Sequence, residues 1–238
     1  MTSKGTARAF AHLSTAELTL LARDPGSLFF MVAFPLMLLM LRGDAPKMET
    51  YVAGYMGMIL AIGGIATLPG IVATYRERKV LRRLATTPIS PFALLTGQVV
   101  AQLVMGIAGA AVIVCAGMVV FDVPPPAHPV ALALAFLLCA LMNYSVGFLI
   151  AAVAPRARTA HLAGLMVMFP MIFLAGAAVP REFLPEAMRG LGDYLPLTPA
   201  VVALRESWSG TPSLLPLLLM AGIIAACTAV AAALFRWE

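Results

Sequence analysis

The sequence predicts an all-α protein that crosses a membrane several times, and its composition and hydropathy carry this prediction. Of its 238 residues, 61% are hydrophobic and only 11% are charged, whereas soluble domains carry about 25% charged residues. The mean hydropathy is +0.95. A soluble globule cannot bury so much apolar surface, so lipid must solvate much of the chain. The apolar stretches do not alternate with polar residues at period two, which favours helices over barrel strands.

Six uncharged apolar stretches approach the ~20 residues that a helix needs to cross ~30 Å of hydrocarbon. The expected spans are Ser27–Leu41, Tyr51–Tyr75, Phe92–Phe121, Pro129–Ala154, His161–Val179 and Ser213–Phe235. The first is the shortest and contains Pro35. It is retained because a sixth span returns the C-terminus to the side of the membrane that holds the N-terminus.

The distribution of basic residues between the spans predicts the orientation. Eleven Lys and Arg residues lie in residues 1–26, 76–91, 155–160 and the tail, against five on the opposite side. Basic residues are retained on the cytoplasmic face. Both termini are therefore expected in the cytoplasm.

Residues 1–26 form an expected amphipathic helix in the membrane surface. Its apolar side carries Ala9, Leu13, Ala16 and Leu20, and the Asp24-Pro25-Gly26 sequence ends it. Such a helix can be a simple membrane anchor or can contact a cytoplasmic partner. The residues leave both interpretations open.

The basic segment 76–91 begins with an expected short helix that Pro88 ends. Val80, Leu81 and Leu84 fall on one face, and basic residues fall on another. The basic residues can hold the segment inside the cell and bind anionic lipid. Alternatively, the apolar face docks into a groove of a cytoplasmic protein.

The segment 180–212 lies on the opposite side of the membrane and is long for a connection. It contains two semi-apolar pieces, Phe183–Leu191 and Ala200–Trp208, separated by a sequence with two prolines. Short helices at the outer interface, or dipping into it, are expected here.

The interior of the spans carries no Asp, Glu, Lys or Arg. Ion-coupled carriers, proton relays and membrane hydrolases need such groups at depth, so these classes are disfavoured and no catalytic residue is predicted. Polar groups remain at Gln98, Gln102 and 143–145, where hydrogen bonds between helices or contact with a ligand are possible. No GxxxxGK[ST] motif occurs, and neither a metal site nor a cofactor site is predicted.

The fifth expected span is rich in Met and Phe around Pro170. Met166, Met168, Phe169, Met171 and Phe173 can line a path for apolar substrates or can simply pack against neighbouring helices.

Two stretches resemble the ABC-2-type permeases, the membrane subunits of ATP-binding-cassette exporters, especially those of daunorubicin and multidrug efflux. The first runs from Tyr75-Arg76-Glu77-Arg78 through Leu81-Arg82-Arg83-Leu84 and Thr87-Pro88-Ile89-Ser90 to Gly97-Gln98. The second runs from Leu174-Ala175-Gly176 through Pro180, Leu184-Pro185 and Pro196-Leu197-Thr198 to Arg205. The chain departs from the family pattern at Gln98, where Lys is usual, at Lys79-Val80, where Gly-Thr is frequent, and at Ala175.

The resemblance implies a bacterial inner-membrane permease that works as a dimer with two separate ATPase subunits, which would bind ATP and Mg. Residues 1–26 would be the connecting helix, and residues 27–238 the transmembrane domain. Residues 76–91 would be the coupling helix that contacts the ATPase, and 180–212 the outer re-entrant helices. The implied coupling residues are Arg76, Glu77, Arg78, Lys79, Leu81, Arg82, Arg83, Leu84 and Pro88. The implied path residues are Met58, Met166, Phe169, Met171 and Phe173, and the outer motif is Gly176, Pro180, Leu184, Pro185 and Pro196.

The uncharged interior and the resemblance together predict export of an amphipathic or hydrophobic small molecule. A lipid or lipid-linked glycan is the alternative cargo. Two other functional classes stay open. The protein can be an ATP-independent channel or secondary carrier, or a purely structural membrane protein.

Overall fold

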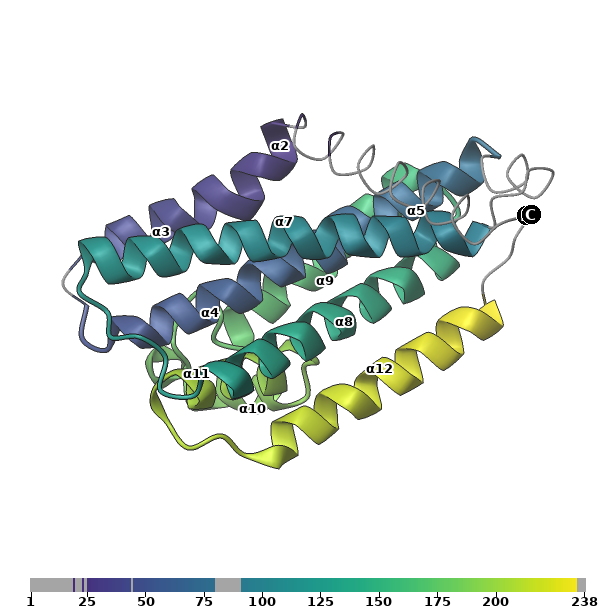
Figure 1. Cartoon of the computed structure of the whole chain (residues 1–238). Coiled ribbons are helices and arrows are strands. Elements are labelled where there is room, and N and C mark those ends of the chain that lie inside the picture. The colour runs from purple at the N-terminus through teal and green to yellow at the C-terminus, as the bar shows by residue number, and fades with distance from the viewer. Residues whose placement is uncertain (1–18, 20–22, 24, 44, 80–90, 235–238) are drawn as a thin grey trace, which may run out of the picture.

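The computed structural model describes residues 19, 23, 25–43, 45–79 and 91–234, and every regular element within them is a helix (Figure 1). Two π-helical segments, η1 and η2, and one 3-10 helix, η3, lie between the α-helices. The elements are α2 (Pro25–Leu28), η1 (Phe29–Ala33), α3 (Phe34–Arg42), α4 (Met48–Ala61), η2 (Ile62–Thr67), α5 (Leu68–Glu77), α7 (Pro91–Val120), α8 (Pro129–Val153), α9 (Ala157–Leu174), η3 (Arg181–Phe183), α10 (Glu186–Asp193), α11 (Leu197–Ser209) and α12 (Leu214–Leu234).

Five helices are long and apolar enough to cross a membrane, and the predicted all-α polytopic fold is confirmed. They are Met48–Glu77, Ala93–Val120, Pro129–Val153, Ala157–Leu174 and Leu214–Leu234. The first expected span corresponds to a shorter apolar helix, Phe29–Arg42. The expected connecting helix at 1–26 lies almost entirely outside the described residues.

The fifth span differs from its expected bounds at both ends. It begins at Ala157, four residues before His161, and ends at Leu174, so that 175–179 form a turn. Gly176 has a φ of +85°, a left-handed conformation that ends helices and suits glycine.

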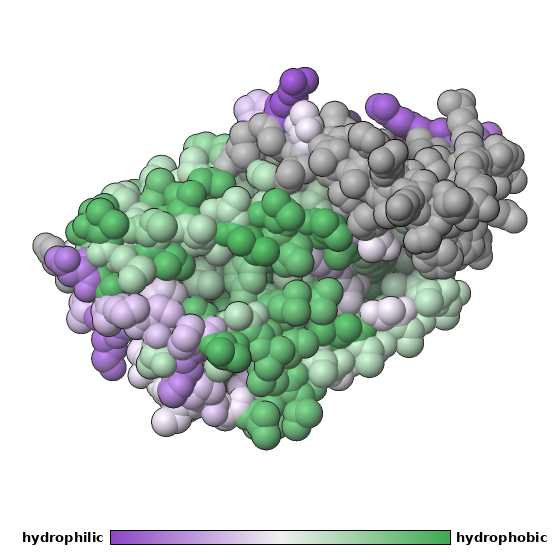
Figure 2. All heavy atoms as spheres, in the orientation of Figure 1, coloured by the Kyte–Doolittle hydropathy of each residue, from purple (hydrophilic) through white to green (hydrophobic). Residues whose placement is uncertain are grey.

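The helix formed by α4, η2 and α5 is the centre of the bundle. In the most apolar 18-residue stretch of this helix 83% of the residues are buried, whereas in that of α12, at the edge of the bundle, 11% are buried. It packs against α7, α8, α9 and α11, while α3 and α12 lie on opposite sides of the bundle (Figure 1). Figure 2 shows hydrophobic side chains along the middle of the bundle and hydrophilic ones at the end that holds α10 and α11.

Glycines let the helices around η2 approach closely. A Cβ atom on Gly147 of α8 would lie 2.0 Å from the carbonyl oxygen of Gly64, and one on Gly164 of α9 would lie 2.2 Å from that of Ile65. Without an intervening side chain the backbones come into van der Waals contact, which is how helices associate in lipid. The position of α8 and α9 against the central helix therefore depends on these residues.

Candidate functional site

The first candidate site lies at the end of the bundle where α5, α8 and α12 end and where α7 and α9 begin (Figure 1). We call it the α5–α9 end. It borders residues 80–90, which hold most of the predicted coupling helix and lie outside the described residues. This segment joins the bundle at the last turn of α5 and at the start of α7.

Arg76, in the last turn of α5, binds the end of α8. Its Nη1 donates a hydrogen bond of 3.2 Å to the carbonyl oxygen of Ala151, and its Nη2 donates to that of Ala154. The last carbonyls of a helix lack partners within the helix, and a cation there interacts favourably with the helix dipole. The half-buried guanidinium thus caps α8.

Glu77, the next residue, binds the start of α9. Its Oε1 accepts a 3.0 Å hydrogen bond from the backbone N–H of Ala157, the first residue of α9. A carboxylate at a helix N-terminus satisfies a free N–H and is favoured by the dipole. Arg76 and Glu77 together hold both helix ends that flank the α8–α9 turn, and we call them the Arg76–Glu77 clamp.

A third contact joins α9 to the central helix one turn further along. His161 Nδ1 lies 3.0 Å from the carbonyl oxygen of Ala66, which belongs to η2. The wider winding of a π-helix alters the backbone pairing of the regular α-helix, and here a carbonyl of that segment has a side-chain partner. The α9 helix is thereby attached to both η2 and the end of α5.

The structure divides the predicted coupling residues into three groups. Arg76 and Glu77 bind backbone groups of their own chain, although Glu77 is also exposed to the surface. Arg78 and Lys79 are exposed, and Lys79 has a φ of +53° where the helix has ended. Leu81, Arg82, Arg83, Leu84 and Pro88 lie outside the described residues, so the docking of their apolar face stays a prediction.

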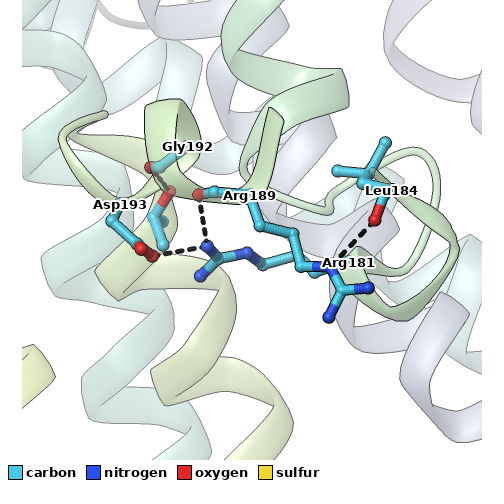
Figure 3. Close-up of polar contacts among 6 residues, drawn as sticks. Arg181, Leu184, Arg189, Gly192 and Asp193 are labelled. Atoms are coloured by element: carbon cyan, nitrogen blue, oxygen red, sulfur yellow. Dashed lines mark hydrogen bonds and ion pairs between the residues drawn. The ribbon is translucent and has the colours of Figure 1, made fainter. Parts of the chain in front are cut away.

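The second candidate site is the cap at the opposite end of the bundle, where Arg181 joins η3 to α10 (Figure 3). Its Nη2 donates a 2.8 Å hydrogen bond to the carbonyl oxygen of Arg189 and pairs with the carboxylate of Asp193. Arg189 Nε in turn donates a 2.8 Å hydrogen bond to the carbonyl oxygen of Leu184. These bonds fold α10 back against the loop that leads to it.

Gly176 of the outer motif has a steric and a polar role. A Cβ atom there would lie 2.6 Å from Arg181 Cγ. Its carbonyl oxygen accepts a 2.6 Å hydrogen bond from Arg205 Nη2. Burial lowers the pKa of the Arg205 guanidinium, although arginine keeps its charge in proteins. Three prolines of the region, Pro180, Pro185 and Pro196, directly precede η3, α10 and α11.

The two outer helices differ in environment. Residues of α10 are mostly exposed, whereas Leu197, Val201 and Leu204 of α11 are fully buried against α4 and α8. Trp208 Nε1 donates a 3.1 Å hydrogen bond to the carbonyl oxygen of Pro124, in the loop between α7 and α8. The α11 helix is thus fixed inside the bundle, while α10 covers its end.

The five predicted path residues do not share one surface. Met166, Phe169 and Phe173 form an exposed stripe on α9, with 77%, 44% and 47% of each residue accessible. Met58 and Met171 are buried in the core of the chain. An apolar path along the surface of α9 therefore includes the first three residues only.

Sequence reasoning missed the partners of the clamp. Arg76 and Glu77 bind backbone groups of Ala151, Ala154 and Ala157, and no residue type marks such a group. At the start of α9 the Thr159 hydroxyl bonds the backbone N–H and carbonyl oxygen of Arg156, but Arg-x-x-Thr is not a capping-box sequence, so it does not mark this helix end in the sequence.

A family model described as ABC-2 type transporter matches residues 8–208. The chain belongs to this family. It is therefore a multi-pass membrane permease subunit of an ABC transporter, and the family implies ABC ATPase subunits as partners. The match covers the Arg76–Glu77 clamp and the outer cap, which places both in the ABC-2 domain. A comparison with curated proteins finds no match.

Proposed function

We propose that this ABC-2 permease exports an amphipathic or hydrophobic small molecule, as a dimer driven by ATP hydrolysis in two separate ATPase subunits. The ATPase subunits bind the α5–α9 end through the apolar face of residues 80–84. ATP and Mg belong to those subunits and not to this chain. The excess of Lys and Arg in the segments at this end supports a cytoplasmic location for it.

The observation that carries the proposal is the Arg76–Glu77 clamp. A force on residues 80–90 acts on the end of α5 and on the start of α7, and α5 continues through η2 into α4 without a break. Because the clamp binds the ends of α8 and α9, a movement of α5 is passed to both helices. Rigid helices that turn about a packed centre are a common means of switching between two states.

The interior supports an uncharged or amphipathic cargo. Within the described residues, the buried polar side chains are all neutral (Gln98, Gln102, Asn143, Ser145, Thr198 and Ser207), and the partly buried Arg205 lies in α11, outside the membrane spans. A permanent charge would find no counter-ion among them, and desolvating it in lipid is costly. The exposed stripe of Met166, Phe169 and Phe173 is a surface on which an apolar cargo can move.

Docking is tested with the full chain and its ATPase in lipid nanodiscs. We expect Leu81→Glu combined with Leu84→Glu to abolish binding of the ATPase and cargo-stimulated hydrolysis, because two charges replace the apolar face. The control variant combines Thr86→Glu with Ser90→Glu, which makes the same net charge change without altering the apolar face or an implied coupling residue. Equal hydrolysis in both variants would overturn the docking proposal.

Cargo and direction are tested in proteoliposomes with the ATPase subunits facing outward. An exporter supplied with external ATP moves an amphipathic dye into the lumen. If a fluorescent phospholipid is moved and none of the amphipathic dyes is, the lipid alternative is favoured. Dye movement that is independent of ATP would instead identify a channel or secondary carrier.

A further inference from the structure

Four polar side chains inside the bundle have atoms without a protein partner. Gln98 and Gln102 of α7 and Asn143 and Tyr144 of α8 are buried, none exposing more than 2% of its surface. Within the described part of the chain, no group bonds Gln98 Nε2, either amide atom of Gln102, Asn143 Oδ1 or the Tyr144 hydroxyl. We call these four residues the polar cluster.

Three members of the polar cluster, Gln102, Asn143 and Tyr144, lie against the π-helical segment η2 of the central helix. A Cβ atom on Gly63 would lie 3.0 Å from Gln102 Oε1, and one on Gly64 would lie 2.9 Å from Tyr144 Cδ1. These two adjacent glycines thus separate the amide of α7 from the ring of α8. The side chains of both neighbouring helices reach the central helix where its winding changes.

The amides and the phenol also converge along α7. Gln98 and Gln102 are one turn apart, and Gly106 follows one turn later on the same face. A Cβ atom on Gly106 would lie 3.9 Å from the Tyr144 hydroxyl oxygen. The hydroxyl therefore lies beside the face of α7 that carries the two glutamines, about one helical turn further along the helix than Gln102.

The polar cluster is only partly satisfied by the protein. The Tyr75 hydroxyl donates a 3.4 Å hydrogen bond to Gln98 Oε1, and Asn143 Nδ2 donates one of 2.7 Å to the carbonyl oxygen of Cys139. Inside a membrane protein a polar group without a partner is strongly disfavoured. Neutral amides and a phenol cannot relieve this by changing charge, so a polar ligand must supply the missing bonds.

We propose that the polar cluster binds ordered water inside the bundle, beside η2. Water is the ligand that fits, because the unpaired atoms include both donors and acceptors and are closed off from the surface. Buried waters generally make about three hydrogen bonds to otherwise unpaired groups. Water-mediated bonds can exchange while the central helix bends at η2, so that the bend does not leave these groups unpaired.

The experiment is X-ray radiolytic labelling of the full chain in lipid nanodiscs, without ATPase. Hydroxyl radicals formed from bound water modify the side chains beside it, so we expect rapid modification of the buried Tyr144. The fully buried Met58 is the reference and is expected to stay unmodified. Absence of labelling at Tyr144 would overturn the proposal, whether or not the chain transports.

A variant separates bound water from transient opening of the bundle. Gln102→Met keeps the size of the side chain and removes its hydrogen-bonding groups, so labelling at Tyr144 should fall several-fold and the melting temperature should decrease. The control is Ser207→Ala, which removes a buried hydroxyl that bonds the carbonyl oxygen of Ala203; it should leave Tyr144 labelling unchanged. Undiminished labelling in Gln102→Met, or a higher melting temperature, would show that the amide binds no water.

Discussion

Replacing Arg76 by Met tests the clamp that joins the coupling segment to the α8–α9 turn. The change removes two hydrogen bonds to the carbonyl oxygens of Ala151 and Ala154 and keeps most of the aliphatic stem. Hydrogen bonds to charged groups contribute about 1.5–3 kcal/mol each, but the guanidinium is only half-buried and water can replace part of this. We expect Arg76→Met to lower the free energy of unfolding by about 2 kcal/mol.

Glu77→Gln should have a smaller effect on stability. The amide oxygen of Gln can still accept the hydrogen bond from the Ala157 N–H, so only the interaction of the charge with the α9 dipole is lost. At an exposed position that interaction contributes about 0.3–1 kcal/mol. We therefore expect Arg76→Met to lower the free energy of unfolding more than Glu77→Gln does, although the two residues are neighbours.

The functional prediction for Arg76→Met is loss of coupling with retained docking. The ATPase should still bind, because the expected docking face at 80–84 is unchanged, but cargo transported per ATP hydrolysed should fall. The assay measures thermal unfolding, ATP hydrolysis and dye transport on the same nanodisc and liposome preparations. Arg158→Met is the matched control, because Arg158 is an exposed basic residue in the first turn of α9, at the same end of the bundle, and is not an implied coupling residue.

Equal melting temperatures and equal transport per ATP in Arg76→Met and Arg158→Met would refute the role of the clamp. Loss of ATPase binding in Arg76→Met alone would indicate that Arg76 contacts the partner directly. A lower melting temperature in Arg76→Met with unchanged transport per ATP would indicate that Arg76 caps α8 but takes no part in coupling.

Two further predictions concern packing at other places in the bundle. Gly147→Ala should greatly reduce the yield of folded protein, because its Cβ would lie 2.0 Å from the Gly64 carbonyl oxygen; Gly222→Ala, which meets nothing within 4 Å, is the control, and size-exclusion chromatography compares the two. Trp208→Phe should lower the free energy of unfolding by about 1 kcal/mol through loss of the hydrogen bond to the Pro124 carbonyl oxygen, and an unchanged thermal melt would contradict it.

Much of the fold could be predicted because membrane spans are apolar along their length. All five long helices fall on expected spans, and the first expected span, Ser27–Leu41, forms the shorter helix Phe29–Arg42. The error at the end of the fifth span has a local cause. The sequence around Gly176 is apolar, but its left-handed φ and its contacts with Arg181 and Arg205 turn the chain out of the helix.

The candidate site was predicted less completely. The basic segment 76–91 and the outer segment 180–212 were predicted from charge and hydropathy, whereas their coupling and re-entrant roles rest on the resemblance to a family pattern and stay predictions. The partners of Arg76 and Glu77 were not, because they are backbone groups at helix ends 75 to 80 residues away in the chain. The burial of Met58 and Met171 could not be separated from the exposure of Met166 by residue type, since Met suits both environments.

The sequence by itself determined which segments enter the membrane, because about 20 consecutive apolar residues are required to cross it. Only the tertiary structure decided which of those helices form the core. The central helix Met48–Glu77 has a mean hydropathy of 2.0, and 83% of its most apolar stretch is buried. The edge helix Leu214–Leu234 has a mean hydropathy of 2.5, yet only 11% of its most apolar stretch is buried. Lipid is as apolar as a neighbouring side chain, so hydrophobicity does not distinguish a helix that faces protein from one that faces lipid. Close contacts at residues such as Gly64 and Gly147 make that distinction, and they exist only once the helices have packed.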